Sequence, residues 1–147
     1  MTQRVSPSAL SVVLVLCLYA CSSQPVLDVQ PPPQARLQVP FSLGYEQTVA
    51  IAETPLRLTF MKMLGDSRCP AGVTCFWAGT ADIELKAASG AESTLIRLST
   101  YHREAKEASV FGYRIQLEDV TPHPVSGRQI APSEYTAHLK VTPLPKN

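Results

Sequence analysis

The stretch Ala81-Asp-Ile83-Glu-Leu85-Lys-Ala87 decides the fold class of this chain. Apolar and charged residues alternate along it with a period of two. Such alternation is typical of a β-strand that buries one face against a core and exposes the other to water. A helix would repeat its apolar positions every three or four residues instead. The stretch therefore predicts one strand of an antiparallel sheet.

The same alternation recurs on both sides of this strand, and Ser89-Gly90-Ala91-Glu92 separates two such runs as a hairpin turn would. We expect an all-β domain, an antiparallel β-sandwich of about seven strands, with a partly open β-barrel as the alternative. Residues 101–109 (YHREAKEAS) have a helical composition but are too few for a stable helix, so we expect a loop with room for one helical turn. The strands are expected at residues 41–45, 47–53, 56–64, 79–88, 92–99, 112–121 and 134–142.

Length and composition narrow the class of protein. The chain has 147 residues, which fits one domain with a tail. Its 45% hydrophobic content is too high for general disorder. A formal net charge of +1 provides no basic excess for a phosphate backbone, so we expect no nucleic-acid partner.

The first twenty residues have the pattern of a secretory signal peptide. Arg4 precedes an apolar run from Ala9 to Ala20, and polar residues follow at once. The run is shorter than the roughly 18 residues that a membrane-spanning helix needs. We therefore expect residues 1–20 to direct export and to be removed.

The end of this segment, Leu18-Tyr19-Ala20-Cys21, resembles a bacterial lipobox. The resemblance implies cleavage before Cys21, a diacylglyceryl group on its sulfur and an acyl group on the new amine. Two or more acyl chains hold a protein firmly on a membrane. Ser22, in place of an Asp, favours the outer membrane if the source is Gram-negative. The alternative is an ordinary secreted protein in which Cys21 merely lies near the cleavage point.

Residues 21–40 follow as a lipidated cysteine and a proline-rich tether. Pro31, Pro32 and Pro33 lack amide donors and favour an extended polyproline helix. We expect a spacer between the membrane and the folded domain, residues 41–147. A ligand for a proline-binding partner is the alternative.

Of the four cysteines, Cys69 and Cys75 remain once Cys17 leaves with the signal and Cys21 carries lipid. An exported protein meets an oxidising compartment, so we expect a structural disulfide between them. A redox-active pair would favour two intervening residues rather than five, and a structural zinc would need four N or S ligands. Both remain alternatives, and we expect no metal.

The string D-S-R-C-P-x-G-V-x-C-x-W-A-G, from Asp66 to Gly79, resembles the hallmark of a group of small uncharacterised bacterial secreted and lipoprotein domains. The later string from Gly112 to Pro122 is similar to a second signature of that group, G-Y-x-I-x-L-x-x-V-x-P. The resemblance implies one β domain over most of residues 41–142 and implies no particular activity.

Four residues of the cysteine loop form the candidate interaction site: Asp66, Arg68, Phe76 and Trp77. Trp77 is the only tryptophan, and we expect it to pack on the disulfide as in other sandwich cores. Arg68 is expected to pair with Asp66 or to lie on the Trp77 ring. Either these residues only fix a long loop, or the cross-linked loop presents Arg68 or Phe76 to a partner.

No pattern for catalysis or cofactor binding is present. His102, His123 and His138 have no second ligand at a metal-type spacing, and there is no G-x-S-x-G or phosphate-binding glycine loop. Glu104 and Glu107 beside Lys106 fit a solvated surface. We therefore expect no catalytic residues and no cofactor.

These observations predict a membrane-anchored envelope lipoprotein with a non-enzymatic binding domain. Its partner would be an envelope protein or a glycan, contacted through residues 65–79 or 100–111. One alternative is an envelope enzyme or inhibitor acting on peptides or glycans, for which His102 and His123 would have to converge with acidic groups in a cleft. A purely structural spacer is the other.

Overall fold

A computed structural model describes residues 31–101 and 105–145 of the chain. The expected signal peptide, Cys21, His102 and Glu104 lie outside these residues. Within these described residues nearly all regular structure is β, with a single 3₁₀ turn, η1, at Pro132–Glu134. No helix in the described part is long and apolar enough to cross a membrane.

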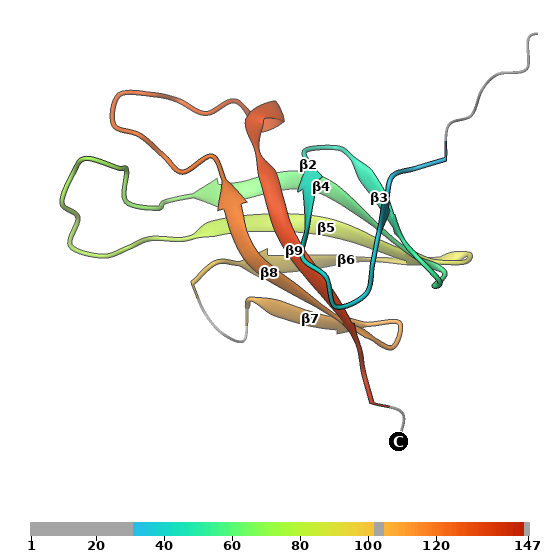
Figure 1. Ribbon diagram of the computed structural model, residues 1–147. Helices are drawn as coiled ribbons and strands as arrows, with labels where there is room; N and C mark the ends of the chain where they lie inside the picture. The colour runs from blue at the N-terminus through green and yellow to red at the C-terminus, as the bar shows by residue number, and fades with distance from the viewer. Residues whose placement is uncertain (1–30, 102–104, 146–147) are drawn as a thin grey trace, which may run out of the picture. The chain divides into compact units, whose positions relative to one another are not determined.

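The strands form two separate sheets that face each other as a β-sandwich, which confirms the predicted architecture over the barrel (Figure 1). The five-stranded sheet has the order β1 (Gln34–Ala35), β3 (Thr48–Ile51), β4 (Leu56–Asp66), β5 (Ala81–Ser89) and β6 (Glu92–Ser99). The four-stranded sheet has the order β2 (Phe41–Gly44), β9 (Thr136–Pro143), β8 (Tyr113–Thr121) and β7 (Glu107–Val110). Every pair is antiparallel except β1 with β3.

The core lies between the sheets and is made by the apolar residues of each alternating run. In β5, Ala81, Ile83, Leu85 and Ala87 are buried, as the alternation predicts. Phe60 of β4 is fully buried as well. The largest fully buried side chains of the facing sheet are Leu43, Ile115, Leu117, Val120 and Leu139.

The seven expected strands all exist, with ends that differ by no more than two residues. The hairpin between β5 and β6 also forms as predicted, because Ser89 pairs with Glu92 and Gly90 has a φ of 60°. Positive φ at the first central residue suits a two-residue hairpin turn and favours glycine there.

Two further strands lie where the sequence indicates a tether and a loop. β1 falls inside the proline-rich segment, and its Ala35 is part of the core. β7 takes up only the last residues of the loop expected at 101–109, because Glu107–Val110 pair with β8 through a turn at Phe111–Gly112. In both cases pairing with a neighbouring strand outweighs the local composition.

Candidate functional site

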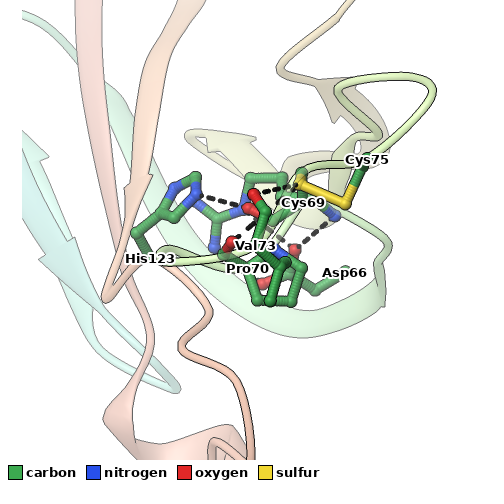
Figure 2. The surroundings of a disulfide bond; sticks show 7 residues. Asp66, Cys69, Pro70, Val73, Cys75 and His123 are labelled. Carbon is green, nitrogen blue, oxygen red and sulfur yellow. Dashed lines mark hydrogen bonds and ion pairs between the residues drawn. A yellow bond between two sulfur atoms is a disulfide. The ribbon is translucent and has the colours of Figure 1, made fainter.

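The cysteine loop, residues 67–80, connects β4 to β5 at one end of the sandwich (Figure 1). Its first residues continue the pairing of these strands: Ser67 N–H donates to the Thr80 carbonyl and Cys69 N–H to the Ala78 carbonyl, both at 2.8 Å. A disulfide joins Cys69 to Cys75, with their Cα atoms 5.8 Å apart, as the sequence predicts (Figure 2). The loop is therefore a covalently closed extension of a hairpin.

Arg68 fixes the base of the loop to the opposite sheet. Its guanidinium donates to both carboxylate oxygens of Asp66, through Nε at 2.9 Å and Nη2 at 2.6 Å. It also donates to the Val120 carbonyl and, at 2.9 Å, to the Pro122 carbonyl. Asp119 lies 3.9 Å from Nη1. The side chains of Arg68 and Asp66 are only 6% and 8% exposed, so the pair is buried.

Arg68 therefore pairs with Asp66, and it is not presented to a partner. This corrects the expectation that its side chain could project from the loop. The contact also joins the two sequence strings described above, since Asp66 and Arg68 belong to residues 66–79 and Val120 and Pro122 to residues 112–122.

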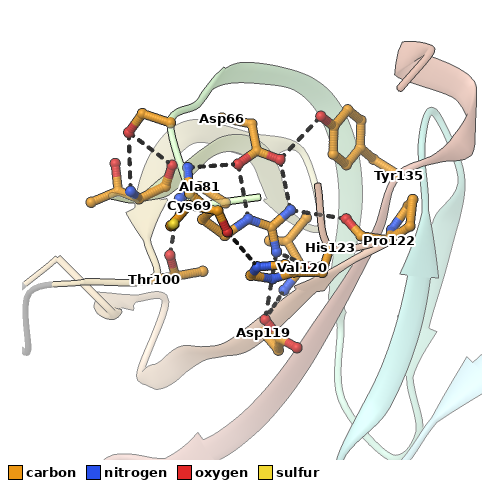
Figure 3. Close-up of polar contacts among 12 residues, drawn as sticks. Asp66, Cys69, Ala81, Thr100, Asp119, Val120, Pro122, His123 and Tyr135 are labelled. Atoms are coloured by element: carbon orange, nitrogen blue, oxygen red, sulfur yellow. Dashed lines mark hydrogen bonds and ion pairs between the residues drawn. The ribbon is translucent and has the colours of Figure 1, made fainter. Parts of the chain in front are cut away.

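Tyr135 completes this cluster, because its hydroxyl donates to Asp66 Oδ2 at 3.1 Å (Figure 3). Burial is the largest influence on the pKa of Asp66 and would raise it. The hydrogen bonds from Arg68, the charge of Arg68 and the Tyr135 hydroxyl together outweigh burial and hold that pKa below its ordinary value. Burial and the Asp66 charge raise the pKa of Tyr135, which keeps its proton as a donor.

A second segment, residues 122–125, supports the loop from the side. His123 Nε2 lies 3.0 Å from the Cys69 carbonyl oxygen (Figure 2). Ala71 N–H donates to the Pro124 carbonyl at 2.8 Å, and Ala71 forms an isolated bridge with Val125. His123 is thus a support of the loop.

Gly79 allows the returning arm of the loop to approach the first one. It has a φ of 71°, and a Cβ atom there would lie 1.8 Å from the Ser67 carbonyl oxygen. No residue with a side chain fits this approach without moving the backbone. The sequence places glycine where the closed loop requires it.

The tip of the loop exposes two aromatic side chains. Phe76 is 96% and Trp77 74% exposed, and their rings meet edge to face with centroids 5.6 Å apart. The expectation that Trp77 packs on the disulfide inside the core is wrong, because the loop extends beyond the end of the sandwich. Trp77 instead lines an open pocket of about 290 Å³ with Gly79, Thr80 and Tyr101.

The tip is also free of charge. Residues 69–81 contain no Asp, Glu, Lys or Arg, and residues 71–78 are all exposed. Val73 of the tip and Val125 of the supporting segment add exposed apolar surface at the same end. Clustered exposed apolar groups of this kind mark interaction surfaces, whereas scattered ones need no explanation.

The histidines that the structure describes do not converge. His123 belongs to the loop support, and His138 lies on the outer face of β9 between Ser42 Oγ, at 3.1 Å, and Thr121 Oγ1, at 2.8 Å. A pocket of about 400 Å³ beside His138 also contains Glu118 and Asp119. Within the described ranges, no three His, Cys, Asp or Glu side chains form a group that could hold a metal.

The sequence-based expectations connect neither Tyr135 nor Tyr101 to the cysteine loop, although Tyr101 falls within the expected contact region 100–111. Tyr135 lies 69 residues from Asp66, and Tyr101 reaches the Trp77 pocket from the far end of β6. Neither position carries a local pattern that would connect it to the loop. Only the pairing of strands brings these residues together.

The chain was compared with protein-family models, curated proteins and solved structures, and none of them matches it.

Proposed function

We propose that this chain is a lipid-anchored binding protein of the cell envelope that contacts a protein partner through Phe76 and Trp77. The single observation that carries this proposal is the exposure of both rings on a loop closed by a disulfide and fixed at its base by a buried ion pair.

Rigidity is the first reason to regard the tip as a binding element. A preformed loop loses little conformational entropy on contact, so more of the contact energy appears as affinity. Tryptophan and other aromatic residues are also enriched among the few residues that dominate protein interfaces, and charged residues are depleted at interface centres. An uncharged tip has few polar groups with which to orient a glycan, which favours a protein partner.

The position of the tip is the second reason. β1 pairs with Ala50 and Ile51 of β3, and Ala50 lies opposite Arg57 of β4. The cysteine loop begins after Asp66, nine residues further along β4, which corresponds to about 30 Å at the usual strand rise. Figure 1 shows the described chain beginning at the side away from the loop. A tether attached there would leave the tip accessible.

Site-specific photo-cross-linking in intact cells tests the proposal. A cross-linker at residue 76 should capture one discrete partner, and a cross-linker at the exposed Ser109 of β7 should not. The double variant Phe76→Ser/Trp77→Ser should reduce recovery of that partner by about tenfold or more, the loss of roughly 1.4 kcal/mol or more expected for two central aromatic contacts.

Met61→Ser is the matched control, since it removes an exposed apolar side chain outside the loop. It should leave partner recovery unchanged. Because the Phe76 and Trp77 side chains project into solvent, the double variant should keep the free energy of unfolding within about 0.5 kcal/mol of the native value. Undiminished recovery with the double variant would contradict the proposal and would favour a spacer function.

A further inference from the structure

The outer edge of β6 is the longest sheet edge in the described part of the chain. Among the described strands at sheet edges, β1 has two residues and β2 and β7 have four each, whereas β6 has eight. β6 contains no proline and pairs with β5 in unbroken register, without the bulges that interrupt β4. Short edges and bulges protect a sheet from further pairing, and β6 has neither.

The register of the β5–β6 hairpin determines which backbone groups of β6 point outward. A two-residue turn is closed by a hydrogen-bonded pair, here Ser89 with Glu92, and the bonded pairs then recur at every second residue. The N–H and C=O groups of Ser93, Leu95 and Arg97 therefore point away from β5. The backbone of Ser99 also points away from β5, as its hydrogen bond shows: the Ser99 N–H donates to the Ala105 carbonyl at 2.8 Å.

In the described part of the chain, no backbone group bonds to the outward N–H and C=O groups of Ser93, Leu95 and Arg97. All three side chains are exposed, so nothing described there covers this part of the edge. Such an alternating row of free donors and acceptors can pair with the backbone of another extended strand.

We propose that this edge pairs with β6 of a second copy of the chain, in antiparallel register centred on Leu95. Only this register pairs all three free residues at once. Leu95 meets its own counterpart, and Ser93 of each copy meets Arg97 of the other. Each of these pairs joins outward-facing groups on both sides and can exchange both backbone hydrogen bonds. The two five-stranded sheets then become one continuous sheet.

The side chains are compatible with this register. A two-fold axis perpendicular to the sheet keeps each side chain on its own face, so residues that meet across it must share a face. Leu95, 57% exposed, meets a second leucine. Arg97 meets a serine, and the half-buried Ile96 meets Thr94, so no like charges lie directly opposite.

The chain ends also permit this arrangement. Rotation about the two-fold axis does not change a residue's position along that axis. Pro31 of both copies therefore lies at the same level, and the two tethers can reach one membrane that is perpendicular to the axis. This step rests on the proposed anchor, whereas the pairing itself does not. The pairing is also independent of the tip, because β6 contributes no residue to loop 67–80.

Cysteine cross-linking of the exported protein in intact cells tests the register. Opposed residues of a hydrogen-bonded pair have Cα atoms about 5.5 Å apart, within the range of a disulfide. Leu95→Cys should give about tenfold more oxidised dimer than Leu64→Cys, a matched exposed leucine on β4. Ser93→Cys and Arg97→Cys should cross-link when co-expressed and not when either is expressed alone.

Leu95→Lys provides the second arm, because it places two like charges opposite each other at the axis. The native protein extracted in detergent should sediment as a dimer and Leu95→Lys as a monomer, with Leu64→Lys remaining dimeric and all three keeping their β circular dichroism. A monomeric native protein, or equal cross-linking at positions 95 and 64, would overturn the proposal. Cross-linking of position 95 to a chain of different mass would also overturn it and would assign the edge to another partner.

Discussion

At the scale of single residues, the buried ion pair between Asp66 and Arg68 is a point at which one substitution should be costly. The pair joins the end of β4 to the end of β8, through the Val120 carbonyl, and to the residue that follows this strand, through the Pro122 carbonyl. Replacing one partner of such a pair leaves the other charge buried without compensation, which is far more costly than the net contribution of the intact pair. The base of the cysteine loop is therefore sensitive to single substitutions.

We predict that Arg68→Met lowers the free energy of unfolding by about 3–5 kcal/mol, because the Asp66 carboxylate loses its cation and two carbonyls lose the guanidinium donor. Denaturant titration measures this change. Arg128→Met is the control, since Arg128 pairs with Glu134 at the surface and its loss should cost less than about 1 kcal/mol. Similar small losses in both variants would contradict the proposed role of Arg68.

The same pair gives stability a dependence on pH. The pKa of Asp66 is lower in the folded protein than its ordinary value. Its contribution is therefore complete above the unfolded-state pKa of about 3.9 and is lost as the pH falls through the lower folded-state value. In Arg68→Met this acid-side loss should be smaller than in the native protein.

At the scale of elements, β1 shows where the folded domain begins. The sequence indicates a proline-rich tether up to residue 40, yet Ala35 is only 5% exposed and its strand pairs with β3. Two residues are too few to show a period of two, so alternation could not reveal this strand. The prolines before it are compatible with the start of an edge strand.

We predict that Ala35→Asp lowers the free energy of unfolding by about 2–4 kcal/mol, because it places a carboxylate in the core. Gln34→Asp, on the exposed side of the same strand, should change it by no more than about 0.5 kcal/mol. Thermal or denaturant unfolding of the two variants distinguishes them. Equal, small effects would show that the domain folds without β1.

β7 escaped prediction for a different reason. Lys106 and Glu107 give its surroundings a helical composition, and only four residues pair with β8. The turn at Phe111 and Gly112 has positive φ at both residues, with values of 51° and 80°. This combination suits a tight hairpin, but phenylalanine is an unusual residue there, so no turn signal precedes Gly112.

At the scale of the whole molecule, periodicity was sufficient for the sandwich because β5, β8 and β9 each turn one face to the core. It was not sufficient for the loop. The disulfide between Cys69 and Cys75 was predicted from the cysteines left after the expected export. The exposure of Trp77 could not be predicted in this way, because it depends on how far the β4–β5 extension projects beyond the core. The contact of Asp66 with Tyr135 depends on the packing of two sheets, which no local pattern records.

The proposed anchor is also a property of the whole chain. We predict that the native protein incorporates radiolabelled palmitate and that Cys21→Ser abolishes the label, since Cys21 would carry the lipid. Cys17→Ser should keep the label, because that residue would leave with the signal peptide. Label retained by Cys21→Ser, or native protein recovered unacylated from the cytosol, would disprove the anchor.

The exposed indole at the tip has a practical consequence. Since the chain contains a single tryptophan, its fluorescence excited at the red edge of the absorption band originates at residue 77 alone. In water an indole with three-quarters of its surface accessible emits at long wavelength, and covering it shifts the emission to the blue. The protein thus carries its own spectroscopic probe, because binding of a partner at the loop tip should shift the emission of Trp77.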